Sequence, residues 1–263
     1  MASAAACGSS DDGTGADGGN ALPDAAPQNL SDARQQDTNA EVYAHSPTTL
    51  YRLDPNTLQV ETVANFSGCG EVIDIALDRN SNLYGTSFTG LFSINRTTAV
   101  CTQIASGNYP NSLSFVPVGV LDPTTEVLVA YLGSDYVRID VTTGAITTIG
   151  AIGGGLFSSG DIVSVEGGGT YLTVGGPNCG DCLVQVNPAD GSLQRNWGEL
   201  GFSNVWGLAF WGGTAYGFSD SGSAFSIEFE GSTVTTTPIA FPGSPPGLRF
   251  WGAGSTTIAP IID

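Results

Sequence analysis

The sequence predicts an all-β protein in which one four-stranded unit repeats along the chain. Short runs of Thr, Val, Ile and aromatic residues alternate with Gly, Pro, Asn and Asp, and nothing suggests a long helix. A β-hairpin pattern also returns five times, at intervals of about 41 to 47 residues. These two observations together predict a repeat architecture built from strands.

The clearest hairpin is Tyr136–Gly150. An apolar strand ends at Ile139-Asp140, a Thr-Thr-Gly turn follows, and a Thr- and Ile-rich strand returns. In each copy an Asp, Asn or Glu is expected to open the turn, where a short polar side chain can bond the backbone two residues on. The other copies are Leu50–Ala64, Leu91–Ala105, Leu183–Gly198 and Ala224–Ala240.

A second apolar run precedes four of the hairpins and follows the fifth, with Ile or Leu at its fourth position. Its copies are Val72–Asp78, Pro110–Val116, Ser159–Val165, Val205–Trp211 and Pro245–Trp251. Between the two motifs lies a further short run, at Leu83–Phe88, Val127–Leu132, Tyr171–Val174 and Thr214–Phe218. Four strands in about 40 to 45 residues is the spacing of one β-propeller blade.

The repeats therefore predict a five-bladed β-propeller of four-stranded antiparallel blades, covering residues 41–263. The last inner strand lacks its own hairpin, and the first hairpin lacks an inner strand. Joining the carboxyl-terminal strand to Glu41–Phe66 would close the ring and remove a free sheet edge. Val42–Ser46 fits the second position of that blade better than residues 255–263, which have no assigned place.

The hairpins resemble those of secreted bacterial propellers of the YVTN/NHL-like type. The pattern is L-x-x-[IVL]-[DN]-x-x-[TD]-G-x-[ILV]-x-x-[IV], and the resemblance covers about residues 41–254. It implies a ligand or partner surface at the mouth of the central channel. Because such propellers host binding proteins, scaffolds and several classes of enzyme, the resemblance indicates architecture and not a particular activity. No catalytic motif of an enzymatic propeller family matches residue by residue.

Residues 1–40 predict a leader followed by a disordered acidic linker. Ala4-Ala5-Ala6 before Cys7 resembles the end of a bacterial lipoprotein signal, in which the cysteine is lipidated. No basic or long apolar region precedes it, so either the start is truncated or the resemblance arises by chance. The following segment has few large apolar residues, which is typical of a flexible tether. This predicts an extracytoplasmic protein, either secreted or a lipoprotein of the outer membrane or periplasm.

The net charge of −18 limits the classes of partner. All seven basic residues are arginines, and such a negative field disfavours nucleic acid and anionic membrane surfaces. No apolar run reaches the ~20 residues of a membrane-spanning helix. We expect a monomer.

Four cysteines besides Cys7 predict two structural disulfides. A Cys69–Cys101 bridge would tie the segment entering the second blade to its outer edge, although the sequence does not fix the pairing. Cys179 and Cys182 form a C-x-x-C pair, which elsewhere can be a redox motif or half a zinc site. The helix of the redox motif and the second pair of zinc ligands are both missing from the pattern, so a disulfide is the favoured interpretation and no metal site is predicted.

The inner strands supply the candidate ligand-binding residues. Alternating positions of these strands share one face, which surrounds the channel. This places Asp74, Asp161, Arg249 and Ser112 at the channel mouth, as a polar pocket for a small ligand or a cation. The alternative is structural: Arg249 pairs with the acids, or the Asp side chains accept backbone N–H bonds between blades.

Four aromatic residues form a second candidate. Trp211 and Trp251 are expected at equivalent positions of adjacent blades, with Trp206 and Phe210 nearby. We expect them in the core between blades, and a carbohydrate or peptide platform is the alternative.

The residue types favour binding over catalysis. His45 is the only histidine, with an expected structural or solvent-exposed role, and the chain has no lysine, so no Schiff base can form. The sequence predicts a non-enzymatic binding module for a protein, peptide or small-molecule ligand, without a cofactor. The alternative is a secreted propeller hydrolase, lyase or cyclotransferase that uses Asp74, Asp161 and Glu71, with Ca²⁺ as its metal.

Overall fold

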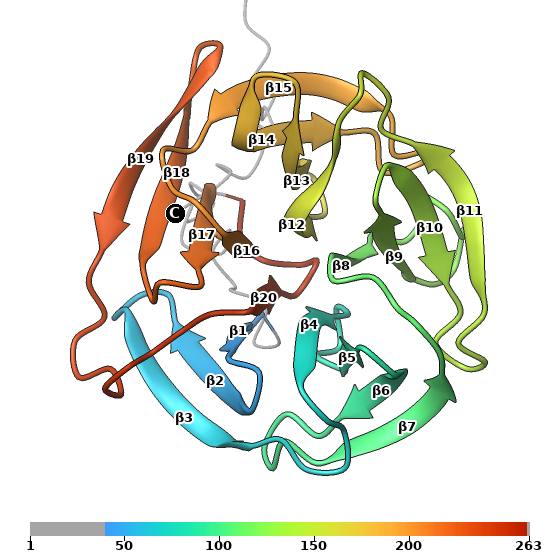
Figure 1. Cartoon of the computed structure of the whole chain (residues 1–263), viewed down its shortest axis with the longest axis vertical. Coiled ribbons are helices and arrows are strands. Elements are labelled where there is room, and N and C mark those ends of the chain that lie inside the picture. The colour runs from blue at the N-terminus through green and yellow to red at the C-terminus, as the bar shows by residue number, and fades with distance from the viewer. Residues whose placement is uncertain (1–39, 262–263) are drawn as a thin grey trace, which may run out of the picture. The chain divides into compact units, whose positions relative to one another are not determined.

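Five antiparallel sheets of four strands each surround a central axis (Figure 1). The computed structural model describes residues 40–261, so the predicted leader with Cys7 and nearly all of the predicted linker lie outside it. The prediction of a five-bladed all-β propeller is confirmed. Within residues 40–261 no helix is long and apolar enough to cross a bilayer.

The blades are numbered along the chain, and their strands are given from the axis outward. Blade 1 comprises β20 (Gly252–Ser255), β1 (Val42–His45), β2 (Thr49–Asp54) and β3 (Gln59–Asn65). Blade 2 comprises β4 (Val72–Leu77), β5 (Leu83–Ser87), β6 (Gly90–Ile94) and β7 (Cys101–Ser106). Blade 3 comprises β8 (Leu113–Val116), β9 (Val127–Leu132), β10 (Asp135–Ile139) and β11 (Ile146–Ala151). Blade 4 comprises β12 (Phe157–Ser164), β13 (Thr170–Gly176), β14 (Cys179–Val186) and β15 (Leu193–Glu199). Blade 5 comprises β16 (Val205–Trp211), β17 (Thr214–Ser219), β18 (Ala224–Glu230) and β19 (Thr233–Ile239).

The core is divided into five apolar layers, one between each pair of neighbouring blades. Leu50 of blade 1 and Ile75 of blade 2, for example, belong to the same buried cluster. The inner strands are buried along their length, as in β4, whereas the outer strand β3 carries Gln, Glu and Thr and is largely exposed. Burial against a neighbouring blade is therefore what holds each sheet in the ring.

The hairpin turns follow the predicted chemistry in four of the five blades. The side chains of Asp54, Asn95, Asp140 and Asn187 accept N–H bonds from the backbone two residues on. The fifth turn differs, because β18 continues to Glu230 and places Glu228 inside the strand. The expectation that Glu228 opens that turn is wrong.

Pairing of the two ends of the described chain closes the ring. β20 pairs antiparallel with β1, so that His45 faces Gly252 and Val42 faces Ser255. The predicted closure is confirmed, but the inner strand is Gly252–Ser255 and not Pro245–Trp251. Two prolines, which lack an N–H, and Gly247 with φ of 70° keep the earlier segment out of the sheet.

The carboxyl-terminal tail, which had no predicted place, crosses the end of the ring at which the inner strands finish. The Thr256 amide donates to Glu41 at the start of blade 1, and the Thr257 hydroxyl donates to Glu126 of blade 3. The Glu166 amide of blade 4 donates to the Thr257 carbonyl, and Ala259 is buried between blades 4 and 5. The tail therefore covers this end, while the opposite end, the mouth, is where the inner strands begin.

Both predicted disulfides are present. Cys69–Cys101 links the segment before β4 to β7, where Ser67 also pairs with Val100 in an isolated parallel bridge. Cys179–Cys182 closes a short loop within β14. Two structural disulfides indicate an oxidising, extracytoplasmic environment.

Candidate functional site

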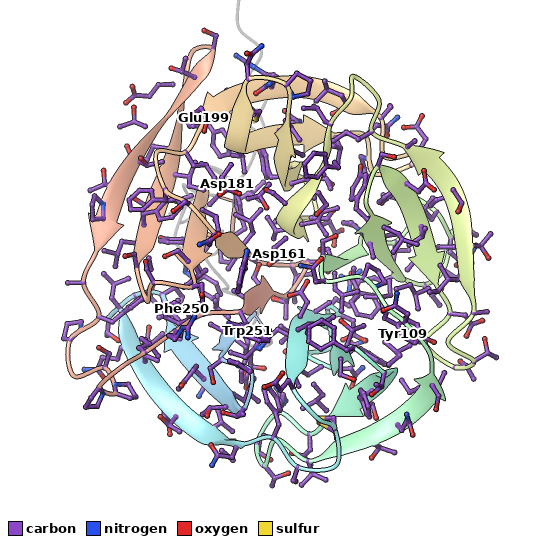
Figure 2. The ribbon with its side chains drawn as sticks, in the orientation of Figure 1. Tyr109, Asp161, Asp181, Glu199, Phe250 and Trp251 are labelled. Atoms are coloured by element: carbon purple, nitrogen blue, oxygen red, sulfur yellow. A yellow bond between two sulfur atoms is a disulfide. The ribbon has the colours of Figure 1, made fainter. Side chains whose placement is uncertain are left out.

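Two carboxyl groups meet at the axis of the ring, and Figure 2 labels one of them, Asp161, near its centre. Asp74 on β4 and Asp161 on β12 are fully buried. Asp74 accepts N–H bonds from Ile75, at 2.8 Å, and from Leu113 of the next blade, at 2.6 Å. Asp161 repeats this arrangement with Ile162, at 2.7 Å, and Leu208, at 2.6 Å.

A fifth inner-strand amide, that of Ala253 on β20, also donates to Asp161. Each of the five inner strands thus contributes one backbone N–H to the two carboxyl groups. Such bonds between blades are the structural alternative stated for these acids. They satisfy buried donors that would otherwise have no partner at the crowded axis.

The two carboxyl groups also hydrogen-bond to each other, which requires a proton on one of them. Burial raises the pKa of both groups well above the usual range. The charge of Asp161 raises the pKa of Asp74 further, whereas the bond from Asp74 acts to lower the pKa of Asp161. Since Asp161 accepts three amides and Asp74 two, the shared proton belongs on Asp74.

His45 lies next to this pair. Its ring is fully buried, Nδ1 bonds the Ser46 carbonyl at 2.9 Å, and Nε2 has no partner among the described residues. A Cβ added to Gly252 would overlap both His45 Nε2 and Asp74 Oδ1, so the two atoms face the same point. Burial lowers the pKa of His45 to about 4, which makes the ring neutral at physiological pH.

An open pocket of about 410 Å³ lies at the mouth, above the carboxyl pair. Four of its residues immediately precede the axial position of their blades, as Ile73 precedes Asp74 and Trp251 precedes Gly252. Among the described residues its lining is aromatic, aliphatic or amide and carries no charge. The lining is Ile73, Phe88, Asn108, Tyr109, Pro110, Asn111, Tyr131, Leu132, Gly133, Trp206 and Trp251.

Two tryptophans occupy the central part of this lining. Trp206 and Trp251 meet edge to face, with ring centroids 5.9 Å apart, and Figure 2 shows Trp251 near the axis. The indole N–H of Trp251 donates to Asp220 at 3.1 Å. Asp220 in turn pairs with Arg249. This chain of contacts fixes the Trp251 ring at the pocket wall.

Three of the four predicted ligand-binding residues are buried around the axis, and the fourth lies elsewhere. Asp74, Asp161 and Ser112 are fully buried, and the Ser112 hydroxyl bonds the backbone of Tyr131 on β9. Arg249 is exposed in the segment before β20 and pairs with Asp220, not with the axial acids. Its predicted place on an inner strand is wrong, because that strand begins three residues later.

The aromatic residues divide between core and pocket. Phe210 is buried, and Trp211 packs against the apolar layers beside blade 5, as expected. Trp251 is equivalent to Trp206 and not to Trp211, because Gly252 and Gly207 hold matching places in their sheets. The expectation of a core position therefore fails for this pair, which is half-buried at the mouth.

Two other features are weaker candidates for a functional site than the mouth pocket. A pocket of about 480 Å³ opens beside Ala40, but two of its three acids are engaged. Glu41 is paired with Arg52 and Arg96, and Asp54 accepts backbone amides of its own turn. Cys179, Cys182 and Glu199 lie close together, but both sulfurs belong to a disulfide and offer no thiolate to a metal.

Comparison with known proteins identifies the fold and no family. No protein-family model matches the sequence, and a search of curated proteins finds no match. A chain from the crystal structure of a nidogen/laminin complex is similar in fold, with a TM-score of 0.52 and 13% identity. The similarity covers 85% of this chain and 99% of that one. At this identity it shows a shared propeller architecture and nothing about activity.

Weaker similarities come from two bacterial structures. A protein of unknown function from Bacteroides caccae has a TM-score of 0.43 and 11% identity, over 81% of this chain and 77% of that one. A protein from Lactobacillus plantarum has a TM-score of 0.39 and 13% identity, over 76% of this chain and 66% of that one.

Proposed function

We propose that this protein is a non-enzymatic, extracytoplasmic binding module that holds its ligand or partner in the mouth pocket. The observation that carries the proposal is the pocket itself: an uncharged, largely apolar hollow of about 410 Å³ at the uncovered end of the ring. Ligand sites are typically concave and apolar, with a few polar groups that fix orientation. Asn108 and Asn111, both exposed, supply such groups.

The axial acids support the fold and not a reaction. A catalytic carboxylate must reach its substrate, whereas Asp74 and Asp161 are fully buried and accept backbone amides. No contact in the described chain favours the hydrolase, lyase or cyclotransferase alternative.

Attachment to a membrane through a lipid on Cys7 is a separate part of the proposal. The supports are the Ala-Ala-Ala-Cys sequence and the long polar segment before residue 41. Mass spectrometry of the product of the full native gene tests it: the expected result is a diacylglycerol-type adduct on Cys7, and an unmodified Cys7 overturns the tether. Binding at the mouth does not depend on this result.

The binding proposal is tested by screening the purified chain against defined panels of saccharides, peptides and small amphiphiles. We expect at least one panel member whose binding is lost in Trp206→Ala and Trp251→Ala and kept in Trp211→Leu, which lies outside the pocket. Thermal unfolding of each variant shows that the fold is intact. If every ligand bound by the wild type is bound equally by both pocket variants, the mouth is not the binding site.

A further inference from the structure

We propose that the partner at the mouth is a polypeptide segment that inserts an apolar side chain into the pocket and places Lys or Arg residues against the rim. This inference rests on the proposed function and names its class of partner. Two independent features carry it: exposed apolar side chains around the pocket, and acidic side chains at the mouth, where the one arginine that the structure describes there is already paired with Asp220.

The apolar surface is wider than the pocket. Phe88, in the turn between β5 and β6, is 60% exposed, and Leu132, at the end of β9, is 49% exposed. Both line the pocket. Phe157, at the start of β12, is 49% exposed, and the amide of the next residue bonds the carbonyl of Gly133 in the pocket lining.

These three side chains belong to blades 2, 3 and 4, on the same face of the ring. A small molecule confined to the pocket would leave Phe157, and the outward-facing parts of Phe88 and Leu132, in water. Contiguous exposed apolar surface around a pocket is typical of a protein-interaction site with one inserted anchor. We therefore infer a partner that is longer than the pocket.

The charges identify the flanks of this partner. Of the six arginines among residues 40–261, five lie toward the end covered by the tail, in turns or in the strand halves that face it. They are Arg52, Arg79, Arg96, Arg138 and Arg195. The sixth, Arg249, is at the mouth and is neutralised by Asp220.

Carboxylates lie at both ends of the ring, so at the mouth they outnumber the single arginine described there. Glu71, two residues before Ile73, and Asp135, two residues after Gly133, are exposed, and their carboxylates have no hydrogen bond or ion pair within the described part of the chain. Asp181 and Glu199 lie at the same end, where they accept backbone amides. Basic residues beside the apolar anchor would meet this field with complementary charge, and acidic ones would be repelled.

The experiment begins with a random peptide library displayed on phage and selected on the full chain. The same library is depleted on Leu132→Ser, and Val100→Ser serves as the matched control. Val100 is 47% exposed, close to Leu132, but it lies in the turn between β6 and β7 at the other end of the ring. We expect enriched peptides that join Trp, Phe or Leu to Lys or Arg and that lose binding in Leu132→Ser and in Phe88→Ser.

One enriched peptide is then synthesised in three forms: as selected, with each Lys and Arg replaced by Glu, and with the apolar anchor replaced by Ala. Each replacement should weaken binding at least about tenfold, which is the size expected for an anchor side chain or for a reversed charge pattern. The double variant Glu71→Gln with Asp135→Asn should weaken the binding of the selected peptide and reduce the dependence of that binding on salt. The variant Glu61→Gln on β3 should change neither.

Three outcomes overturn the inference. The first is enriched peptides without basic residues, and the second is binding of the basic peptide that does not need its anchor. The third is no peptide that distinguishes the wild type from Leu132→Ser. Binding of a saccharide or small amphiphile that still requires Trp206 and Trp251 would leave the proposed function standing in each of these cases. If no ligand depends on the pocket for its binding, both the proposed function and this inference are contradicted.

Discussion

Asp74 and Asp161, on inner strands two blades apart, share one proton at the axis of the ring and together accept one backbone amide from each of the five blades. The pair therefore connects all inner strands through two side chains. Its electrostatics make the stability of the ring dependent on pH in a defined direction.

The first prediction concerns this pH dependence. The pKa of both carboxyl groups is raised in the folded state, so the folded chain binds more protons than the unfolded chain. The contribution is complete below the unfolded carboxyl pKa of about 3.9 and is lost as pH rises toward the folded pKa. In Asp74→Asn this loss should be smaller, because the titration of Asp74 is removed and the amide can donate to Asp161 at every pH, while the burial of Asp161 remains. Urea unfolding across the pH range measures it.

The matched control for that variant is Asp122→Asn. Asp122 is exposed, and hydrogen bonds from Thr124 and Thr125 lower its pKa to about 2. Its contribution has the opposite sign, since it is present above about pH 3.9 and is lost as pH falls toward 2. A pH profile of Asp74→Asn that matches the wild type would show that the axial pair does not hold the proton.

The second prediction is that Ca²⁺ does not stabilise the ring. The oxygens of Asp74 and Asp161 already accept N–H groups, whose positive ends would repel a cation, and Ca²⁺ requires six to eight oxygen ligands. The midpoint of thermal unfolding should be the same in Ca²⁺ and in chelator. An increase with Ca²⁺ that is abolished in Asp74→Asn would place a metal at the axis instead.

The third prediction is an acid-sensitive histidine. Because the pKa of His45 is lowered to about 4 from an unfolded value of about 6.5, its contribution to stability is present above pH 6.5 and is lost as pH falls toward 4. The full loss of free energy of unfolding from this group is about 3 kcal/mol. Since His45 is the only histidine, one imidazole resonance in an NMR titration reports it directly. A midpoint near 6.5 would contradict the buried, neutral ring, and His45→Phe should remove this acid-sensitive contribution.

The repeated hairpins could be predicted from the sequence because each one has a recognisable local residue pattern. In four of the hairpins an Asp or Asn opens a turn between two strands of alternating apolar residues. The four turns opened by Asp54, Asn95, Asp140 and Asn187 have the expected hydrogen bonds. The inner strand β20 gave no such signal. It reads Gly-Ala-Gly-Ser, because small residues are needed where His45 and Asp74 crowd the axis, and small residues do not mark a strand.

The mouth pocket could not be predicted, because its walls come from turns and strand starts that lie far apart in the sequence. Phe88 and Leu132 look like ordinary strand-end residues until the ring brings them to one face. The available clue was Pro245-Pro246-Gly247, which excludes a strand there and would have shifted the alignment so that Trp251 matched Trp206. The axial acids were identified correctly as neighbours, but their burial depends on packing that no local pattern reveals.

The fourth prediction tests the closeness of packing at the axis. Gly252→Ala should destabilise the fold by about 2 to 3 kcal/mol, because the new methyl group would overlap His45 and Asp74, which cannot move away inside the ring. Gly70→Ala is the matched control. No atom lies within 4 Å of the Cβ it would gain, and its backbone is not in the left-handed region. Chemical unfolding of the two variants should show a lower free energy of unfolding only in Gly252→Ala. Equal stabilities would mean that the axis can accommodate an added methyl group.

The fifth prediction compares the two disulfides. Cys69–Cys101 spans 32 residues of chain and Cys179–Cys182 spans 3, so the first restricts the unfolded chain far more. Replacing both cysteines of a pair by Ala should lower the free energy of unfolding by about 3.5 kcal/mol for the longer loop and about 1.5 kcal/mol for the shorter one. Removing Cys69–Cys101 should also release the Ser67–Val100 bridge and expose the β7 edge to proteolysis. Equal losses in the two double variants would show that the bridges act through local packing and not through the unfolded chain.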